Sequence, residues 1–426
     1  MAGMNDVGSA AGFAKPGPSQ REFLLVLTDG GGTIPPELGV ARRLVGRGHR
    51  VTVLAAESMA GQVRASGAKY LPCKGAPVGE LRDWGRQGPA RLARAMVDHM
   101  FVGPAPGQAE STMEVLRQSQ TSLVLASFPA FGAMIAAEAH GTDFAVLMPN
   151  AYPLPARGLP QPVTGMSPAR GPLGRLRDSV VAAGSSRLMD RYALARVNAL
   201  RADHGLAPIA TTWDQVHHAR RQLILTSAAF DFPGELPANA RYVGPILDDP
   251  AWATDTQWTP PVGEVPLVLV SMSSTFQDHV ACLQRIADAL GMLPVRGLLT
   301  TGPAIQPGQI RAPANVTVVA SAPHSRVLPD ASLMITHGGH GTVIKALAAG
   351  IPLVILHHGR DQAGNAVRVT ARGAGVSVPR SAQAPRIAKA VAHVLATPGY
   401  GQAAQTLGRS IAGDAKENAL LAELEG

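Results

Sequence analysis

The stretch "REFLLVLTDGGGTIPPELGVARRLVGRGHRVTVLAA", residues 21–56, decides the expected fold class. Its residues 23–27 form an apolar run that passes directly into a glycine-rich turn. A helix is expected next, because Pro35 and Pro36 suit a first helical turn and apolar residues then recur at helical spacing. The following run, residues 51–55, is again continuously apolar, as strands of parallel sheets are. This strand–helix–strand order predicts an α/β fold.

The same order recurs along the chain and predicts two similar halves, each a parallel sheet covered by helices on both faces. Further apolar runs are "TSLVLASF", "FAVLMPN" and "RQLILTS" in the first half, and "LVLVSMSST", "VRGLLTTG", "VTVVAS", "SLMITHGG" and "IPLVILHHG" in the second. We expect a disordered tail over residues 1–20, a Rossmann-like N-terminal domain over 21–243, a linker over 244–266, a Rossmann-like C-terminal domain over 267–405 and a C-terminal helix over 406–426, for which packing back on the N-terminal domain is one option.

Composition limits the class of protein. The chain has 426 residues, of which 46% are hydrophobic and 16% charged, and this length suits two domains better than one core. No apolar stretch reaches the roughly 20 residues that cross a bilayer, and the first block lacks the basic start and apolar centre of a signal peptide. Cys73 and Cys282 form no metal or redox pattern. We therefore expect a cytoplasmic protein without stable membrane insertion.

The net charge of +8 raises the question of an anionic partner. Nucleic acid is not expected, because the chain has no run of Lys and Arg and only 4% of its residues are aromatic. A small anionic ligand accounts for the charge equally well.

Residues 153–180 are rich in proline and glycine, as in "PLPARGLPQPVTGMSPARGPLGRLRD". This density predicts a long loop without helices or strands on the open side of the first half. Because such loops usually shape binding sites, we expect this loop to border a ligand.

A second glycine turn, "HGGHGT" at residues 337–342, follows the apolar run 331–336 and precedes a helical pattern. Ligands of open α/β sheets bind beyond the carboxyl ends of the strands, where this turn lies. Its glycines let a ligand approach the main chain, and the helix start adds N–H groups and a positive end. His337 and Thr342 add side-chain donors. The turn predicts a phosphate site, unless its glycines serve only for close packing.

The residues from Thr336 onward, "THGGHGTVIKALAAGIPLVILHHGRDQAGNAVRVTARGAGVSV", closely resemble the donor-binding signature of the GT-B glycosyltransferases related to plant and bacterial UDP-glycosyltransferases, the GT1 family. The shared pattern is a His, a small-residue turn, a Ser or Thr, a Gly-x-Pro strand, then Asp-Gln and an Asn. The bacterial macrolide and natural-product subgroup is the most similar. The resemblance implies a GT-B fold, in which two Rossmann-like domains with parallel sheets face a central cleft.

The resemblance also implies where a nucleotide-sugar donor binds. The 337–342 turn would hold the diphosphate, and Asp361 and Gln362 would form hydrogen bonds with sugar hydroxyls. The full implied donor site comprises Ser273, Ser274, Thr275, Ala322, His324, His337, Gly338, Gly339, His340, Gly341, Thr342, Asp361 and Gln362. The base is left open between uracil and thymine, because Ser321 stands where many members carry an aromatic residue.

On the acceptor side, the resemblance implies a lipophilic small molecule bound by the N-terminal half. The expected contacts are Met100, Phe101, Phe128 and Tyr152. No cofactor and no metal ion are expected, because the acidic residues of "LDDPAW" lie in the linker, where such residues are ordinarily solvated. The diphosphate would then leave with help from the helix end and hydrogen bonds alone.

In this family a histidine in the first glycine turn commonly takes the acceptor's proton, and a later aspartate orients it. Here those positions fall on Thr33 and near Ser127, and an alcohol such as Thr33 cannot act as a base near neutral pH. Three alternatives stay open: Asp29, His99 or His340 serves as the base, the acceptor is acidic enough to need none, or catalysis has been lost.

The sequence and the resemblance together predict an inverting, metal-independent glycosyltransferase. It would move a sugar from a UDP- or dTDP-sugar to a polyketide, macrolide or aromatic natural-product aglycone. Attachment to nitrogen or carbon of an activated acceptor is one alternative, and a non-catalytic homologue that binds nucleotide sugar is another. A nucleotide-dependent oxidoreductase is disfavoured, because "GGGTIPP" is not Gly-x-Gly-x-x-Gly. Assembly as a homodimer is left open.

Overall fold

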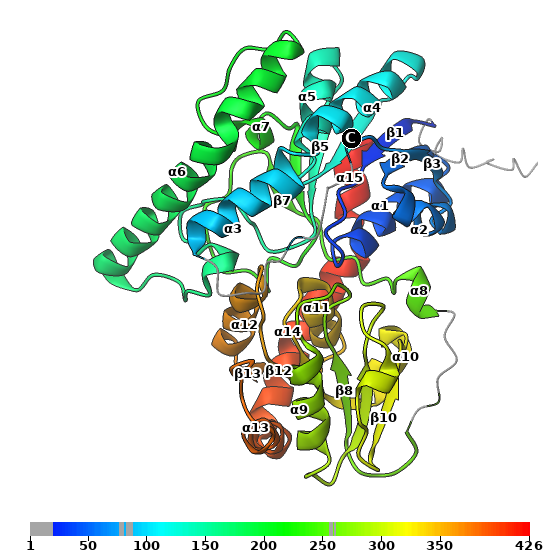
Figure 1. The fold of residues 1–426 in the computed structure, drawn as a ribbon, viewed down its shortest axis with the longest axis vertical. Helices are drawn as coiled ribbons and strands as arrows, with labels where there is room; N and C mark the ends of the chain where they lie inside the picture. Colours follow the sequence, from blue (N-terminus) through cyan, green and yellow to red (C-terminus); the bar gives the residue numbers. More distant parts are fainter. Residues whose placement is uncertain (1–19, 76–80, 82–87, 255–258, 260) are drawn as a thin grey trace, which may run out of the picture.

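The structure, a computed structural model, describes residues 20–75, 81, 88–254, 259 and 261–426. Residues 1–19 of the expected tail, and 255–258 and 260 of the expected linker, lie outside the described residues. The chain forms an upper and a lower α/β unit, each built around one twisted sheet (Figure 1). The α/β, two-sheet prediction is therefore confirmed.

The first sheet has seven parallel strands in the order β3-β2-β1-β4-β5-β6-β7. The strands are β1 (Glu22–Val26), β2 (Arg50–Ala55), β3 (Lys69–Pro72), β4 (Leu123–Ser127), β5 (Phe144–Met148), β6 (Arg221–Ile224) and β7 (Ala240–Tyr242). The helices of this half are α1 (Ile34–Gly46), η1 (Glu57–Met59), α2 (Ala60–Ala65), α3 (Pro89–Met96), η2 (Val97–Phe101), α4 (Ala105–Gln118), α5 (Phe131–His140), η3 (Pro162–Thr164), α6 (Gly171–Asp203) and α7 (Asp214–His217). The strand order reverses between β1 and β4, which opens a crevice beyond their carboxyl ends.

The second sheet has six parallel strands in the order β10-β9-β8-β11-β12-β13. They are β8 (Leu267–Ser271), β9 (Arg296–Thr300), β10 (Val316–Val319), β11 (Ala331–Thr336), β12 (Leu353–Ile355) and β13 (Gly375–Ser377). The remaining helices are α8 (Ala251–Thr254), α9 (Val280–Leu290), η4 (Pro307–Gln309), α10 (His324–Val327), η5 (Leu328–Asp330), α11 (His340–Ala348), α12 (Gln362–Ala371), α13 (Ala384–Ala396), α14 (Pro398–Lys416) and α15 (Ala419–Glu425). Here the order reverses between β8 and β11.

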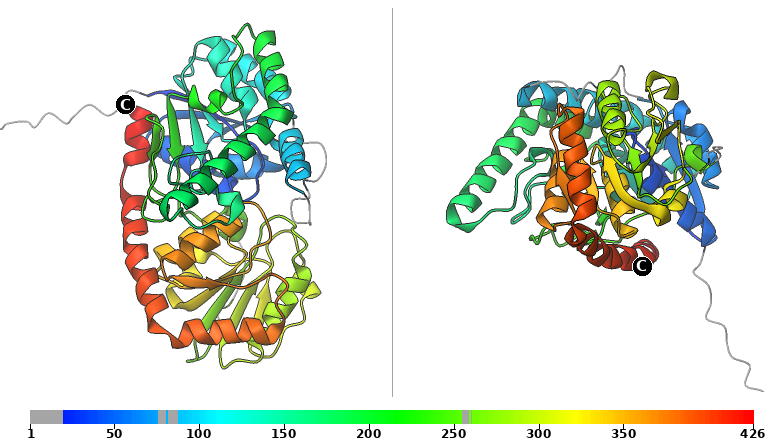
Figure 2. Two further views of the ribbon diagram at one scale, coloured as in Figure 1. Left: turned by 90° about the vertical axis from the view of Figure 1, so that its left-hand side faces the viewer. Right: turned by 90° about the horizontal axis from the view of Figure 1, so that it is seen from below.

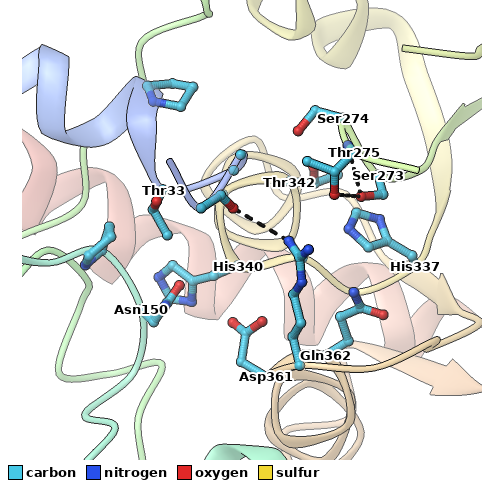
Figure 3. A pocket seen from close by; sticks show the side chains of 18 of the residues that line it. Thr33, Asn150, Ser273, Ser274, Thr275, His337, His340, Thr342, Asp361 and Gln362 are labelled. Atoms are coloured by element: carbon cyan, nitrogen blue, oxygen red, sulfur yellow. Dashed lines mark hydrogen bonds between the residues drawn. The ribbon is translucent and has the colours of Figure 1, made fainter. Parts of the chain in front are cut away.

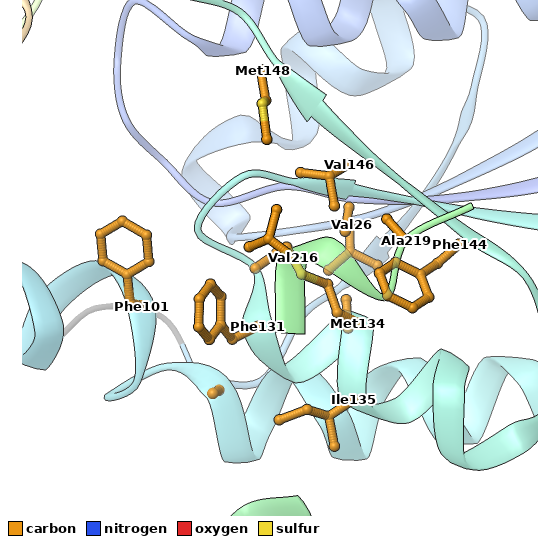
Figure 4. Close-up of a cluster of buried hydrophobic side chains, with 14 of the residues drawn as sticks. Val26, Phe101, Phe131, Met134, Ile135, Phe144, Val146, Met148, Val216 and Ala219 are labelled. Carbon is orange, nitrogen blue, oxygen red and sulfur yellow. The ribbon is translucent and has the colours of Figure 1, made fainter. Parts of the chain in front are cut away.

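Both faces of each sheet are covered, which explains the continuous apolar runs of the sequence. Every residue of β4 and β5 is buried. Figure 4 shows one of these covered faces, where Val26 and Val146 from the strands lie over Phe131 and Met134 from α5. The carboxyl ends of the strands, which carry the turns, are left as the places where the two halves meet.

The proline- and glycine-rich segment contains a helix that the sequence prediction missed. Residues 153–180 were expected to be loop throughout, but α6 starts at Gly171 and continues to Asp203. Pro172 lies in the first turn, where its missing N–H costs no helical hydrogen bond. The prediction was wrong because proline was counted as a helix breaker at a position where it begins a helix.

The end of the chain returns to the first half. Helix α14 begins at Pro398 rather than at 406, and α15 then lies beside the first sheet, as the red helices in the left view of Figure 2 show. Leu420 and Leu424 join the apolar core under β1 and β2. Glu425 forms an ion pair with Arg47 at 3.0 Å. In the described part of the chain, no helix is both long and apolar enough to cross a membrane.

Candidate active site

A cleft of about 920 Å³ lies between the two halves. The turns after β1, β4 and β5 line one side, and the turns after β8, β11 and β12 line the other. The sequence-predicted residues in its wall are Asp29, Thr33, His99, Met100, Phe101, Phe128, Ser273, Ser274, Thr275, Ala322, His324, His337, Gly339, His340, Gly341, Thr342, Asp361 and Gln362. The structure therefore brings nearly all of them together, and it leaves out Gly338 and Tyr152.

The glycine turn shapes the second side of the cleft. Gly338 adopts a φ of 93°, which favours glycine, and a Cβ there would lie 2.9 Å from Ile355. Its N–H donates to Thr336 Oγ1 at 3.2 Å and its carbonyl accepts the Asn365 amide at 2.9 Å. Gly338 therefore supports the turn from behind and lies outside the cleft lining, with its N–H and carbonyl both paired within the protein.

Helix α11 begins at the floor of the cleft. The N–H groups of His340, Gly341 and Thr342 belong to the first turn of the helix, where no preceding carbonyl is available to accept them. They carry the positive end of the helix dipole into a cavity that an anion can enter. This geometry suits the binding of a phosphate.

His337 stands beside this helix start. Burial lowers the pKa of its imidazole to about 3, and the neighbouring His358, His279 and Arg360 act in the same direction. The ring is therefore neutral and offers one N–H donor. A Cβ on Gly339 would lie 2.6 Å from His337 Nε2, so glycine at 339 leaves room for the ring.

His340 points toward the first half of the molecule. Figure 3 shows its ring next to Asn150 and near Thr33. The ring packs edge-on against Phe230 with centroids 5.5 Å apart, and neither ring nitrogen has a well-aligned hydrogen-bond partner among the described residues. Burial lowers its pKa to about 4, so it is neutral at ordinary pH.

Asp361 and Gln362 begin helix α12 but differ in their hydrogen bonds. Asp361 accepts the Asn365 amide at 2.9 Å, and burial raises its pKa. Gln362 Oε1 accepts the N–H groups of His358 at 2.7 Å and Gly359 at 3.1 Å, and its Nε2 donates to Gln277. Most of the polar capacity of Gln362 is used to hold the loop at 357–359, which leaves one amide hydrogen for a sugar.

The remaining donor-side residues follow β8 and β10. Ser273 Oγ lies 3.1 Å from Thr275 Oγ1 and accepts the Thr275 N–H, so these hydroxyls order the turn after β8. His324 Nε2 lies 3.2 Å from Ser271 Oγ at the far end of the cleft. Burial lowers the pKa of His324 to about 4.

The linker acids are paired, contrary to the expectation that they are solvated. Asp248 forms ion pairs with Arg42 and Arg43 of α1 at 2.9 and 3.0 Å. Asp249 forms an ion pair with Lys345 of α11 at 2.9 Å and accepts a hydrogen bond from the backbone N–H of Ser325. The two carboxylates thus fasten the linker to both halves. The expectation was wrong because the linker packs against helices that supply cations.

The acceptor side is apolar and aromatic. Phe101 lies edge-on to Phe128 at 5.5 Å, and Phe128 stacks on Trp213 at 5.8 Å. Tyr152 does not belong to this wall. It is fully buried and its hydroxyl donates to Gln222 at 3.0 Å, so the expected acceptor contact was wrong.

The residues expected to replace the missing catalytic base differ in their surroundings. Asp29 is exposed, and its carboxylate accepts the Gly31 N–H at 3.0 Å, as a turn residue does. His99 lies in η2 and lines the cleft. Thr33 is the residue immediately before α1.

Some polar cleft residues were missed, among them Glu37, Asn150 and Arg360. Glu37 is 1% exposed, and burial raises the pKa of its carboxyl to about 8, a rise opposed in part by a hydrogen bond with Ser127. Asn150 follows β5. Arg360 has a positive φ of 55° and donates to the Gly30 carbonyl at 3.4 Å across the cleft. In the sequence, Glu37 looks like an ordinary acidic residue in a first helical turn, and the other two lie in loops.

Comparison with known proteins agrees with this geometry. Residues 285–425 match the family described as erythromycin biosynthesis protein CIII-like, C-terminal domain. The chain is 29% identical over 395 residues to 4'-demethylrebeccamycin synthase of Lentzea aerocolonigenes, an alignment that covers 88% of this chain and 92% of the relative.

Solved structures share the fold. The glycosyltransferase of kitacinnamycin superimposes with a TM-score of 0.75 and 22% identity, covering 96% of this chain and 99% of the other. The spinosyn rhamnosyltransferase SpnG in complex with thymidine diphosphate superimposes with a TM-score of 0.68 and 18% identity, covering 96% and 100%. The chain therefore has the GT-B fold and is homologous to bacterial glycosyltransferases of natural-product and antibiotic biosynthesis.

Proposed function

We propose that this glycosyltransferase inverts the anomeric centre of a UDP- or dTDP-sugar and transfers the sugar to a lipophilic natural-product aglycone without a metal ion. The observation that carries the proposal is the pairing of two unlike walls in one cleft. The start of α11 and the His337 imidazole present hydrogen-bond donors on one wall, and Phe101 and Phe128 present aromatic surface on the other.

The donor half of the proposal follows from charge. A nucleoside diphosphate carries its negative charge at the point where the first-turn N–H groups of α11 and the Thr342 hydroxyl are available. These groups would stabilise the charge that develops on the leaving diphosphate. Because SpnG was solved in complex with thymidine diphosphate, dTDP-sugars should be tested as donors beside UDP-sugars.

The acceptor half follows from shape and polarity. Met100, Phe101 and Phe128 give an apolar, aromatic wall that suits a lipophilic aromatic or polyketide ring system. Because the acceptor would approach from the side opposite the diphosphate, direct displacement would invert the anomeric carbon. Attachment to nitrogen or carbon of an acidic or activated acceptor is the alternative to test beside oxygen attachment.

The test is a mass-spectrometric screen of UDP- and dTDP-sugars against phenolic, macrolide and indole acceptors, in buffer with and without EDTA. The expected result is a glycosylated product with the inverted linkage, equally abundant with EDTA. Product from no pair, with nucleoside diphosphate still bound in calorimetry, would favour the non-catalytic alternative. A product that disappears in EDTA and returns with Mg²⁺ would show that the metal-independent part of the proposal is wrong.

A further inference from the structure

We propose that the Glu37 carboxylate is the general base that takes the proton from the acceptor group that attacks the sugar. The proposal rests on the proposed function, since it assigns a residue to the transfer step. Glu37 lies on α1, one helical turn after Thr33 and on the same helix face, and it lines the cleft.

The hydrogen bonds around Glu37 leave one oxygen available. A hydrogen bond with Ser127 holds the carboxyl, and Ser127 Oγ itself accepts the Thr28 N–H at 3.2 Å, which leaves its hydroxyl hydrogen for Glu37. Glu37 Oε2 is buried and has no hydrogen-bond partner among the described residues. An unpaired carboxylate oxygen in a cleft wall is costly for folding, which is typical of groups kept for function.

The other acids of the cleft are engaged elsewhere. Asp248 is paired with Arg42 and Arg43, and Asp249 with Lys345. Their charges are committed to cations, so they are poor proton acceptors. The remaining two acids are held by hydrogen bonds: Asp29 accepts the Gly31 N–H and Asp361 accepts the Asn365 amide.

No cation opposes the buried Glu37 carboxyl within the described residues, so burial dominates its titration. The pKa of about 8 places its ionised form within reach of the working pH and makes it a strong acceptor of protons. Titratable and charged groups line the same cleft from several other elements: Asp29, His99, Asp248, Asp249, His324, His337, His340, Lys345, His357, His358, Arg360 and Asp361.

The proposed step is balanced. As the acceptor oxygen or nitrogen bonds to the anomeric carbon, its proton passes to Glu37. The bond between that carbon and the diphosphate oxygen breaks, and the electron pair leaves on the nucleoside diphosphate.

The first experiment compares Glu37→Gln with the wild type. Donor consumption is measured with dTDP-glucose and UDP-glucose, with water and a series of substituted phenols as acceptors. We expect Glu37→Gln to lower kcat/KM by ~10²-fold or more, and most for the least acidic phenol, because a base matters most there. The affinity for dTDP and UDP should stay unchanged. Glu114→Gln, an exposed acid outside the cleft, is the matched control and should be as active as the wild type.

The pH profile separates a base from a structural residue. In the wild type, kcat/KM should rise with pH and level off near the Glu37 pKa of about 8. The residual activity of Glu37→Gln should lack this rise. Glu37→Ala, whose smaller side chain leaves a cavity, should regain activity when formate is added, and the unmodified protein should not respond to formate.

The outcomes separate the two proposals. A wild type that consumes neither donor with any acceptor overturns the proposed function together with this one. An active wild type whose Glu37→Gln variant keeps both its rate and its rise with pH overturns only the assignment of Glu37. Loss of the rise in Asp29→Asn instead would assign the proton to the first glycine turn and overturn the assignment in the same way.

Discussion

His337 illustrates how burial sets the chemistry of a single side chain. The ring lies between the glycine turn and the cleft, and removal from water disfavours its charged form. At ordinary pH it can therefore contribute a neutral hydrogen bond to the donor, without a positive charge.

We predict that His337→Ala lowers kcat/KM roughly 10- to 100-fold, because a hydrogen bond to a charged group is worth about 1.5–3 kcal/mol. The loss should be equal at about pH 6 and about pH 9, because a ring of pKa about 3 is neutral at both values. Steady-state kinetics at both pH values measure it. His393→Ala, an exposed histidine on α13, is the control. A loss that appears only at the lower pH would contradict the neutral assignment.

Asp361 and Gln362, which are adjacent at the start of α12, differ in the hydrogen bonds that their side chains form. Gln362 ties the backbone at 358 and 359 to the helix, whereas Asp361 accepts the Asn365 amide and a backbone N–H of its own residue. A loop anchor and a ligand contact should respond differently to substitution.

We predict that Gln362→Ala lowers the free energy of unfolding by about 1–3 kcal/mol and weakens nucleotide binding, because it leaves buried N–H groups unpaired. Asp361→Asn keeps the shape and should impair sugar transfer while free dTDP and UDP bind nearly as before. Denaturant unfolding and calorimetry test both variants. If nucleotide affinity collapses in Asp361→Asn, the placement of this residue at the sugar is wrong.

Helix α12 is also joined to the first half by a buried ion pair. Arg368 and Asp231 are both fully buried, with Nη2 and Oδ1 2.7 Å apart. The other carboxylate oxygen accepts the Tyr152 N–H and the Tyr242 hydroxyl. The pair therefore fixes the segment after β6 against α12.

We predict that Asp231→Ala lowers the free energy of unfolding by about 3–5 kcal/mol, because it leaves the Arg368 charge buried without a partner. Glu235→Ala removes an exposed pair with Arg157 and should cost about 1 kcal/mol or less. Urea unfolding of both variants gives the comparison. Equal losses would mean that Arg368 finds another partner or reaches water.

The elements that the sequence predicted well are those whose residues are buried on both sides. The central strands read as unbroken apolar runs, whereas the edge strands β3, β7 and β13 have only three or four residues with mixed burial and were missed. The first turn of α6 was missed because proline is tolerated in the first turn of a helix but disrupts a helix interior, and the sequence alone does not separate the two cases.

Some residues of the cleft can be identified from a local sequence pattern, whereas others can be identified only from their burial in the fold. The glycine turn and the Asp-Gln pair stand in fixed spacing and could be placed by pattern alone. Glu37 could not, because its significance comes from burial and from Ser127, which is distant in the sequence. Tyr152 was misplaced because a strand end offers alternate residues to the cleft and to the interior.

The whole molecule holds its two halves against each other at several places. The linker acids reach α1 and α11, α15 packs on the first sheet, and a Cβ on Gly31 would lie 2.5 Å from Thr275 across the cleft. This close approach removes water from polar groups around the cleft, and it buries histidines that an open molecule would hydrate.

Burial of these histidines gives the stability a defined pH dependence. The buried rings are His279, His324, His337, His340 and His358, and burial is the largest cause that lowers the pKa of each, to about 3 for His337 and about 4 for the others. Below pH ~6.5 the unfolded chain binds protons on these rings and the native protein does not. Stability present above that pH is therefore lost as the pH falls toward 4.

Glu37 acts with the opposite sign. Its pKa is raised in the native protein, so the native state binds a proton that the unfolded chain releases between pH 4.5 and about 8. Stability from this group therefore falls as the pH rises through that window, by up to about 1.4 kcal/mol per pH unit. Five histidines outweigh one carboxyl on the acid side, and Glu37 dominates above about pH 7, where the unfolded rings have lost most of their protons.

We therefore predict that the free energy of unfolding is highest near pH ~7, falls steeply toward pH 5 and falls gently toward pH 8. Guanidinium unfolding at these three pH values measures it. Glu37→Gln should abolish the gentle fall and keep the steep one, because it removes only the carboxyl proton. His340→Phe should lessen the steep fall and keep the gentle one. A protein as stable at pH 5 as at pH ~7 would mean that the cleft opens and hydrates its histidines, and the closed arrangement of the two halves would then not be the stable state in solution.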